Sequence, residues 1–472
     1  MFKVLFPKDK KVFKEVLVLS YPVVLSNISR VLMSIFDVAM VGRLGAEALA
    51  ATGMGGMLVW APMSIALGIR TAVQTVSSRR LGQKKEAESG TAFHNGLIMA
   101  TVFGLPISLA GWLWAKDIVP LFLKDPLVIK FAIDYTTICF ISIVFSVYSF
   151  VFVGFYNGVE KTKVHMTVTI VSNLINLYLN AALIYGSDGI RVFFEDVAPS
   201  FSFLSILWSW ASFPALGVKG AAIATLIASI WMVAHYSFFL FTDSVKTRFS
   251  VLSFSFDKTM MKRQLNLAIP MGVQEGVIAF GWTFFLKIVG IIGTVELATT
   301  HIVFTIMHAS FMPAMGVGMA CSTLVSKYMG EGKIEQSVSS IKESVRLAEY
   351  GMGLLGLSFI VFSRFYLSIF TDDQTIIEMG IFGLRIVGAL QFLDAIAFVL
   401  MFALMGAGNT VFPAVVESCV TWVVTVFGTY YFGVIWGFGF IVPWLLFPIH
   451  MGLVAVIMVW KIYQGDWKTI EV

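Results

Sequence analysis

The stretch PVVLSNISRVLMSIFDVAMVGRLGAEALAA, residues 22–51, decides how this chain folds. It is an apolar run long enough for a membrane helix, followed by a short turn that contains glycine, and it carries the carboxylate of Asp37. A carboxylate is costly to hold inside a bilayer, so Asp37 is a candidate functional residue. The framework returns 248 residues later, where Pro22 corresponds to Pro270 and Phe285 takes the place of Asp37. The pattern therefore indicates a duplicated membrane protein whose two halves differ at this acid.

The composition agrees with a chain that crosses a membrane many times. Of the 472 residues, 58% are hydrophobic and 13% are charged, and the mean hydropathy is +0.86. The cysteines Cys139, Cys321 and Cys419 lie inside apolar runs, which favours small core residues over disulfides or metal ligands. Twelve spans are predicted, near residues 15–41, 51–78, 92–115, 127–157, 164–186, 215–241, 265–291, 300–326, 346–370, 378–406, 412–435 and 440–463.

Basic residues are distributed unevenly between the two sets of loops. The tails and the connections after even-numbered spans hold 22 of the 33 Lys and Arg, whereas the opposite loops hold seven. The positive-inside rule then places both ends of the chain in the cytoplasm, which requires an even number of spans. The basic N-terminal segment shows no cleavable signal pattern, so the first apolar segment is expected to stay as a membrane helix.

The internal repeat keeps one register from about residue 19 to residue 162. Beyond the first block, identical residues recur at the same offset, among them Gly68 with Gly316, Thr75 with Thr323, Ser78 with Ser326, Gly82 with Gly330 and Gly158 with Gly406. Six spans in each copy give the copies the same orientation and relate them by an axis along the membrane normal. The predicted fold is therefore an all-α polytopic membrane protein whose twelve transmembrane helices form two pseudo-symmetric six-helix bundles.

The predicted domain boundaries follow from the six spans in each half and the polar segment between them. An N-terminal six-helix lobe is expected over residues 1–242, a polar and basic cytoplasmic linker over 243–264, and a C-terminal six-helix lobe over 265–472. Residues 187–214 have no counterpart of equal length in the second half and are rich in aromatic residues. They are predicted to lie at the outer membrane interface, either as a loop without function or as a cap over the outer mouth.

Two polar stripes accompany Asp37. Asn27, Arg30, Ser34 and Asp37 share one helical face, and Asn173, Asn176 and Asn180 share a face of the fifth predicted span. Arg30 and Asp37 are about 10 Å apart along a helix, which is too far for a simple direct pair. Carboxamide oxygens beside a carboxylate suit Na⁺ or a water that relays a proton, although asparagines also join helices without further function. We expect the three asparagines and Asp37 to form the ion-coupling site, with Arg30 and Ser34 modulating it.

The second half carries its own acids. Glu275 follows Pro270 by five residues, and Asp394 lies in the middle of the tenth predicted span, so both are predicted to bind substrate. Glu417 lies nearer the end of a span, where a structural role is favoured. The six histidines show no metal-ligand spacing, and no resident metal is expected, apart from Na⁺ at Asp37 if that is the coupling ion.

These motifs resemble those of the MATE family, the multidrug and toxic compound extrusion transporters. The resemblance rests on residues 41–51, the Gly68–Gly82 block and its twin Gly316–Gly330, the turn at Gly406–Thr410 and the 6+6 repeat, and it covers nearly the whole chain. Asp37 looks like the first-helix acid of the family, and Asp394 is placed like the helix-10 acid of its NorM-like branch. Two positions depart from the family pattern: Ile278 occupies the usual position of the helix-7 glutamate, and the turn has Asn409 in place of aspartate.

The resemblance implies a secondary active antiporter that exports amphipathic organic cations in exchange for Na⁺ or H⁺. No nucleotide-binding P-loop is present, so an ion gradient is the expected energy source and no cofactor is expected. A lipid-linked saccharide flippase of the same superfamily is the alternative, and it would need cleft-facing cations such as Arg30 and Arg70. A membrane enzyme is disfavoured, because the chain has neither His-Glu-x-x-His nor the Gly-x-Gly-Asp of aspartyl proteases.

The expected surroundings of the protein follow from the same resemblance. Its partners are expected to be cationic drugs and the lipid bilayer, with no nucleic acid, and the chain is expected to act as a monomer. We expect a multi-pass protein of the bacterial inner membrane.

Overall fold

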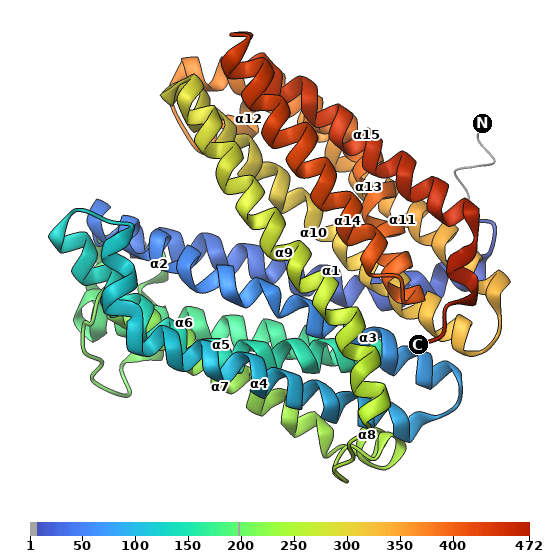
Figure 1. Ribbon diagram of the computed structural model, residues 1–472. Coiled ribbons are helices and arrows are strands. Elements are labelled where there is room, and N and C mark those ends of the chain that lie inside the picture. Colours follow the sequence, from blue (N-terminus) through green and yellow to red (C-terminus); the bar gives the residue numbers. More distant parts are fainter. Residues whose placement is uncertain (1–6, 197–198) are drawn as a thin grey trace.

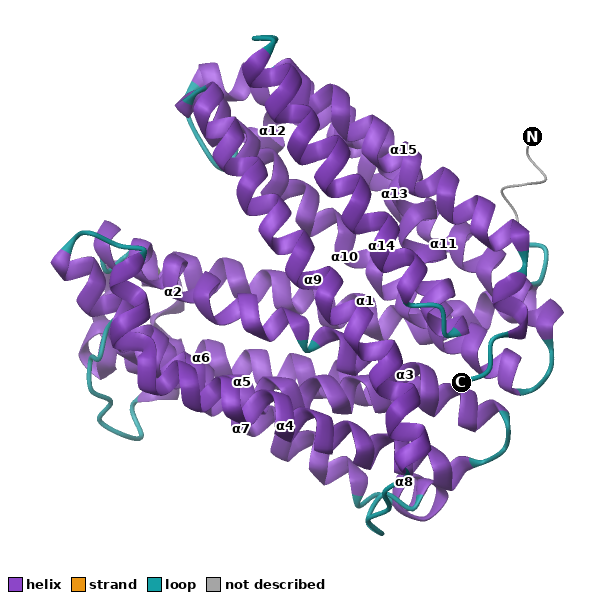
Figure 2. Cartoon of the chain, in the orientation of Figure 1, coloured by secondary structure: helices purple, strands orange, loops and turns teal. Residues whose placement is uncertain are grey.

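The computed structural model describes residues 7–196 and 199–472, with the side chains of residues 193–202 and 204 outside the description. Over this part of the chain the regular structure is helical (Figure 2). Twelve helices or joined helix pairs are long and apolar enough to span a membrane, as predicted. The N-terminal half contains α1 (Lys10–Gly42), α2 (Ala46–Ile65), α3 (Leu67–Gly82), α4 (Glu86–Ile118), α5 (Pro126–Gly158), α6 (Thr162–Asp196), α7 (Val218–Leu240) and the short α8 (Asp243–Phe249). The C-terminal half contains α9 (Lys258–Ile292), α10 (Thr294–Gly330), α11 (Ile334–Val361), α12 (Ser363–Ser368), α13 (Gln374–Ala407), α14 (Val411–Val420), π-helical turns over 421–435, and α15 (Ile441–Gln464).

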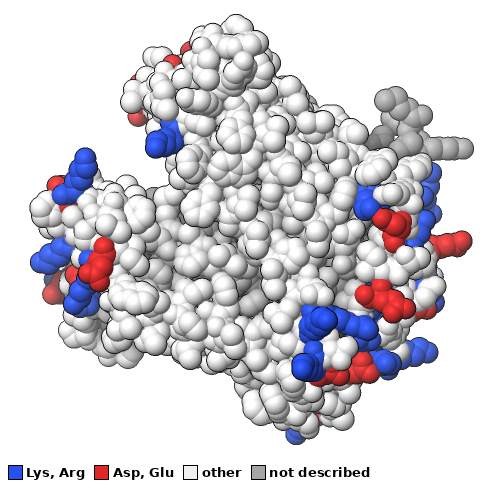
Figure 3. All heavy atoms as spheres, in the orientation of Figure 1, with Lys and Arg blue, Asp and Glu red and all other residues white. Residues whose placement is uncertain are grey.

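The helices form two bundles arranged as a V (Figure 1). The lobes meet at the end where α8, the start of α11 and the C-terminal residues lie, which we term the closed end. They diverge towards the turns at 43–45 and 436–440, which we term the open end. The space-filling view shows this gap as a wide hollow between the lobes (Figure 3). The predicted pair of six-helix bundles is therefore present, and it encloses a cleft open at one end.

The first helix of each half crosses from one lobe to the other. The start of α1 packs with α10 and α11, whereas Asp37 and Met40 near its end bond to α6. Likewise, the start of α9 packs with α3 and α4. Asn27 donates to the Met312 carbonyl at 3.3 Å, and Gln264 donates to the Ala92 carbonyl at 2.9 Å. The helices α1 and α9 therefore each contact helices of both lobes.

Glycines of the repeat allow the lobes to approach closely at the closed end. A Cβ on Gly82 would lie 2.0 Å from the carbonyl oxygen of Lys327, and one on Gly330 would lie 2.3 Å from that of Arg79. These two contacts are related by the same 248-residue offset as the sequence repeat. A side chain at either position would displace a backbone, so glycine is required there by the contact between the lobes.

Serine hydroxyls strengthen the same contact in repeat-related pairs. Ser78 Oγ donates to the carbonyl of Thr323 at 2.5 Å, and Ser326 Oγ donates to the carbonyl of Thr75 at 2.8 Å. All four residues are buried. The duplicated motif therefore builds a two-fold interface to which each half contributes a serine hydroxyl donor and a glycine that permits close approach.

Charged side chains lie at the two ends of the visible face, and an apolar band separates them (Figure 3). Many large apolar side chains of the described residues are exposed, including Leu32, Leu105, Phe280 and Leu354. Exposed apolar side chains of this density belong against lipid, because soluble proteins rarely expose such continuous apolar surface. The chain is therefore a multi-pass membrane protein.

Several details differ from the sequence predictions. The ninth span ends at Val361, before a short separate helix, whereas the prediction extended to residue 370. The helix α9 begins at Lys258, inside the predicted linker. Cys139 and Cys321 are buried as predicted, but Cys419 is exposed.

The predicted interfacial segment 187–214 begins as helix. After a kink at Gly186, where φ is +71°, α6 continues to Asp196. Trp208 stacks on Tyr178 of α6 with ring centroids 4.9 Å apart, and Trp210 donates to the Tyr178 hydroxyl at 2.6 Å. These described contacts hold the segment against α6 of the N-terminal lobe. Residues 197 and 198, and the side chains of Glu195, Asp196, Pro199 and Phe201, lie outside the described part.

Candidate functional site

Asp37 and two of the predicted asparagines come together between α1 and α6. The side-chain nitrogen of Asn180 donates to Asp37 Oδ1 at 2.5 Å and to Asn176 Oδ1 at 3.1 Å. Asn176 and Asn180 are buried and Asp37 is half-buried. The 3.6-residue period places Asn176 and Asn180 one turn apart on the face that meets α1, so the sequence stripe becomes a contact. Three side chains with oxygen atoms therefore converge in the first lobe.

The oxygen of Asn180 is buried without a hydrogen-bond partner. The amide nitrogen of Asn180 carries two hydrogens and cannot bind a cation. A cation at Asp37 therefore requires the Asn180 side chain to rotate so that its oxygen faces Asp37. Carboxylate and carboxamide oxygens are the donors that hard cations prefer, and a proton can instead reside on Asp37 itself. Among the described residues no group of three His, Cys, Asp or Glu side chains is placed to hold a metal, so a Na⁺ site here depends on the amides.

The third predicted asparagine lies one step away from this cluster. Asn173 donates to the hydroxyl of Ser29 at 2.8 Å, which joins α6 to α1. Ser29 was not singled out from the sequence, because a serine inside an apolar helix usually bonds to its own backbone. In this structure Asn173 fastens the two helices that carry the Asp37 cluster.

The stripe on α1 divides between two environments. Asn27 is buried and bonds to α10 of the other lobe, whereas Arg30, Ser34 and Asp37 lie further along the helix. Arg30 and Asp37 form no ion pair with each other, as the spacing predicted; the carboxylate has Asn180 instead. Ser34 is exposed.

Arg30 lies beside a buried polar network that the sequence did not reveal. His165 Nδ1 and the Tyr236 hydroxyl are 2.7 Å apart, and Tyr156 donates to the Tyr236 carbonyl at 3.0 Å. Arg30 is within electrostatic range of Tyr236 and of Arg70 on α3. Histidine and tyrosine in apolar runs look like ordinary core residues in sequence, and only the packing of α6 on α7 brings them together.

The acids of the second half lie apart from the Asp37 cluster. Asp394 on α13 has no exposed surface, and neither of its carboxylate oxygens has a hydrogen-bond partner. Glu275 on α9 is half-buried and within electrostatic range of Arg70 across the lobe interface. Asp394 therefore has no surface in the cleft in this conformation, whereas Glu275 lies at the junction of the lobes.

Glu417 occupies a third position in the same lobe. It is within electrostatic range of both Asp394 and Glu275, and its carboxylate lies 3.4 Å from His450 Nε2. The other ring nitrogen of His450 is 2.7 Å from the hydroxyl of Thr425, in the π-helical part of the eleventh span. Glu417 thus forms part of a partly buried polar contact between α14 and α15.

Comparison with known proteins places the whole chain among one group of transporters. A sequence model of the MatE family matches residues 22–182 and 270–431, which are the two repeat halves. The probable multidrug resistance protein NorM of Thermotoga maritima is 24% identical over 427 residues, covering 89% of this chain and 86% of the relative. The probable multidrug resistance protein YoeA of Bacillus subtilis is 23% identical over 456 residues, covering 95% and 92%.

Solved structures agree with the fold. One described as the outward-facing conformation of a multidrug resistance MATE family transporter has a TM-score of 0.85 at 18% identity, covering 98% of this chain and 97% of that one. A eukaryotic MATE transporter has a TM-score of 0.81 at 16% identity, covering 97% of each chain.

Proposed function

Because the chain belongs to the MATE family, we propose that it exports amphipathic organic cations in exchange for Na⁺ or H⁺ by alternating access. It is a membrane transporter and not an enzyme, and its relatives are multidrug transporters. The observation that carries the proposed ion coupling is the Asp37–Asn180 contact, in which a carboxylate near the C-terminal end of α1 meets a carboxamide of α6 in the N-terminal lobe. An ion or proton there competes with the cationic substrate for the protein, either directly or by favouring a different arrangement of the lobes.

The proposed conformational cycle exchanges the open and closed ends. With both termini in the cytoplasm, the present structure is open to the outside, and the interface of α3 with α10 seals the inside. Movement of the two lobes as rigid bodies would close the open end and separate the paired glycine contacts at Gly82 and Gly330. Because the inner interface is a small set of repeat-related contacts, it suits a two-state switch.

We assign the ion to the first lobe, at Asp37 with Asn176, Asn180 and the nearby Asn173, and the substrate to the second lobe, at Asp394 and Glu275. Arg30 and Ser34 lie on the helix that carries Asp37 and would modulate the ion site. Apolar cleft walls accept varied hydrophobic bodies, while buried carboxylates attract a cation strongly at low dielectric. Asp394 lacks exposed surface here, so its contact with a substrate requires α13 to shift during the cycle. The alternative, a lipid-linked saccharide flippase, is not favoured by relatives described as multidrug resistance proteins.

Transport by the purified chain in lipid vesicles tests this function. A fluorescent organic cation should move against its gradient when an inward Na⁺ gradient or an inward H⁺ gradient is imposed, and the active gradient identifies the coupling ion. Vesicles with equal ion concentrations on both sides serve as the control. Lack of transport under both gradients would refute ion-coupled export.

The proposed orientation in a bacterial inner membrane has its own test. Single cysteines placed at Lys10, Lys85 and Lys258, at the closed end, should be protected from an impermeant thiol reagent added to intact cells. A cysteine placed at Asp372, in the exposed turn before α13, should be labelled. The opposite labelling pattern would invert the orientation. Labelling is done in a background in which exposed Cys419 is replaced by serine.

A further inference from the structure

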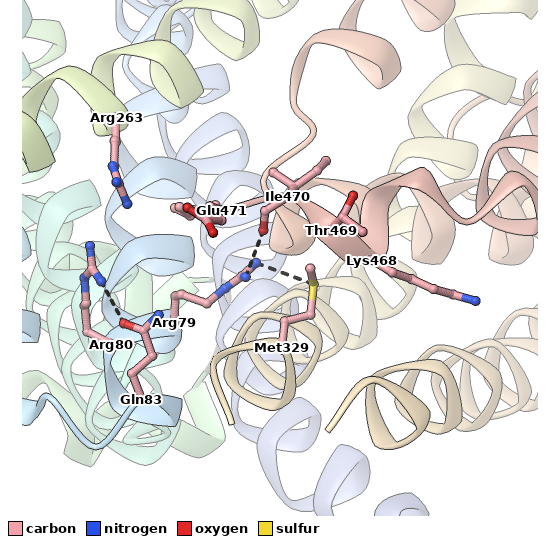
Figure 4. Close-up of a pocket in the computed structure, with 10 residues that line it drawn as sticks. Arg79, Arg80, Gln83, Arg263, Met329, Lys468, Thr469, Ile470 and Glu471 are labelled. Carbon is pink, nitrogen blue, oxygen red and sulfur yellow. Dashed lines mark hydrogen bonds between the residues drawn. The ribbon is translucent and has the colours of Figure 1, made fainter. Parts of the chain in front are cut away.

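A cavity of about 400 Å³ lies at the closed end, apart from the polar sites described above. Its wall combines the end of α3, the start of α9 and the residues that follow α15, as Figure 4 shows. Arg79 and Arg80 come from α3, Arg263 from α9 and Lys468 from the segment after α15. Gln83 and Lys468 are exposed, so the cavity opens to the surface. Residues of both lobes therefore line the cavity, at the closed end that would open in the proposed transport cycle.

The segment 466–472 is held in place as one wall of this cavity. Trp467 has no exposed surface and packs in the C-terminal lobe, with its indole nitrogen donating to the Ile462 carbonyl at 3.0 Å. Val472 is buried in one apolar cluster with Val76 on α3 and Leu267 on α9. The segment thus bridges the lobes, with Trp467 packed in one and Val472 in the other, and it forms a stable wall of the basic cavity.

Arg79 is a buried charge whose hydrogen-bond acceptors are all neutral. Its side chain is only 4% exposed, and its guanidinium donates to the carbonyls of Ala407 at 3.0 Å and Ile470 at 3.1 Å (Figure 4 shows the contact with Ile470). The remaining contacts are the hydroxyl of Ser326 and the sulfur of Met329. Burial of a cation without an acid is costly, so an anion in the adjoining cavity would stabilise it.

The other charges around the cavity leave an excess of positive charge. Arg80 Nε lies 3.2 Å from Oε2 of Glu88, a residue that does not line the cavity. Arg263 makes no ion pair with any described residue. Glu471 is the one acidic side chain among the lining residues, against the guanidinium groups of Arg79, Arg80 and Arg263, whereas the ammonium of Lys468 points away from the cavity (Figure 4). Guanidinium groups are planar donors that match the oxygens of phosphate, and basic pockets on the cytoplasmic side of membrane proteins attract anionic headgroups.

We propose that this cavity binds a phosphate-bearing anion, supplied by the headgroup of an anionic phospholipid or by a soluble phosphate. The anion contacts Arg80 and Arg263 and offsets part of the buried positive charge of Arg79. It therefore joins α3 and α9 to the segment that follows α15. It binds the state in which the closed end is sealed, and therefore favours the conformation that is open at the other end. This site is distinct from the proposed ion and substrate sites, and its test does not require transport.

Thermal unfolding of the full chain in uncharged detergent tests the site. Short-chain phosphatidylglycerol should raise the melting temperature in a saturable manner, whereas phosphatidylcholine with the same acyl chains should not, because only a ligand that prefers the folded state stabilises it. Protection by inorganic phosphate alone, at equal concentration, would identify a soluble ligand as the source, and protection by the lipid alone would identify the headgroup. Absence of a shift with either ligand would overturn the proposal.

Matched variants locate the binding. Arg263→Gln should weaken the apparent affinity for the protecting anion about tenfold or more, as expected for loss of one charge-assisted hydrogen bond. Arg80→Gln, which removes the second guanidinium that the proposal places against the anion, should weaken it in the same direction. Lys262→Gln removes an equal charge from the adjacent exposed position, which does not line the cavity, and should leave the affinity unchanged. Unchanged affinity in both lining variants would refute the site.

Discussion

Asp37→Asn is expected to abolish export driven by an ion gradient while leaving the protein folded. Asparagine offers an oxygen where Asp37 Oδ1 now accepts from Asn180, so the hydrogen bond between α1 and α6 can persist. What disappears is the negative charge, and in a membrane its interaction with a cation is strong. We expect ion affinity to fall at least 100-fold, which corresponds to about 2.7 kcal/mol or more. Removing a costly carboxylate also leaves stability equal or higher.

Asp394→Asn is the matched variant for this experiment. It removes a carboxylate of the same kind from the other lobe, where the group is fully buried and lacks hydrogen bonds. Under the proposed assignment it should weaken substrate binding more than ion binding, measured by equilibrium binding of the fluorescent cation and of the coupling ion. Normal transport by Asp37→Asn, together with loss of ion binding in Asp394→Asn, would place the ion in the second lobe.

Gly82→Ala is expected to have the largest effect on the interface at the closed end. The added methyl group would lie 2.0 Å from the Lys327 carbonyl, so α3 and α10 must move apart. Overpacking of this kind typically costs 1–3 kcal/mol, and a clash with backbone lies at the upper end, about 3 kcal/mol. We therefore expect a lower melting temperature and a population shifted away from the state with the sealed closed end.

Two further glycine variants make this prediction specific. Gly330→Ala should reproduce the effect, because its Cβ would lie 2.3 Å from the Arg79 carbonyl in the repeat-related contact. Gly351→Ala is the control, since apart from the backbone of its own helix no atom lies within 4 Å of its Cβ position. Alanine there favours the helix and should stabilise it by about 0.5–1 kcal/mol. Equal melting temperatures for Gly82→Ala and Gly351→Ala would show that the close approach does not constrain the protein.

Much of the fold was predictable because it depends on periodicity and on the duplication. The apolar runs give the twelve spans. The constant offset of the repeat relates the Ser78–Thr323 hydrogen bond to the Ser326–Thr75 hydrogen bond, so either contact predicts the other. The Asp37–Asn180 contact was also predictable, since an acid in lipid needs a polar neighbour and the asparagine stripe offered one.

The features that escaped prediction depend on which helix lies next to which. Periodicity gives the polar face of a helix but not its neighbour, so the crossing of α1 and α9 between lobes was not foreseen. For the same reason the pairing of His165 with Tyr236 was not foreseen. The helix break at Phe362 carries neither proline nor glycine and left no signal.

The central claim is that occupancy of Asp37 controls the movement of the two lobes. Nitroxide labels at Leu44 and Ile291, exposed positions at the open end of each lobe, report the distance between the lobes by pulsed electron spin resonance. In the otherwise native protein, the distance distribution should change between saturating coupling ion and saturating substrate, and in Asp37→Asn it should no longer respond to the ion. A distribution that stays fixed in the native protein, or that responds to the ion equally in Asp37→Asn, would contradict this account.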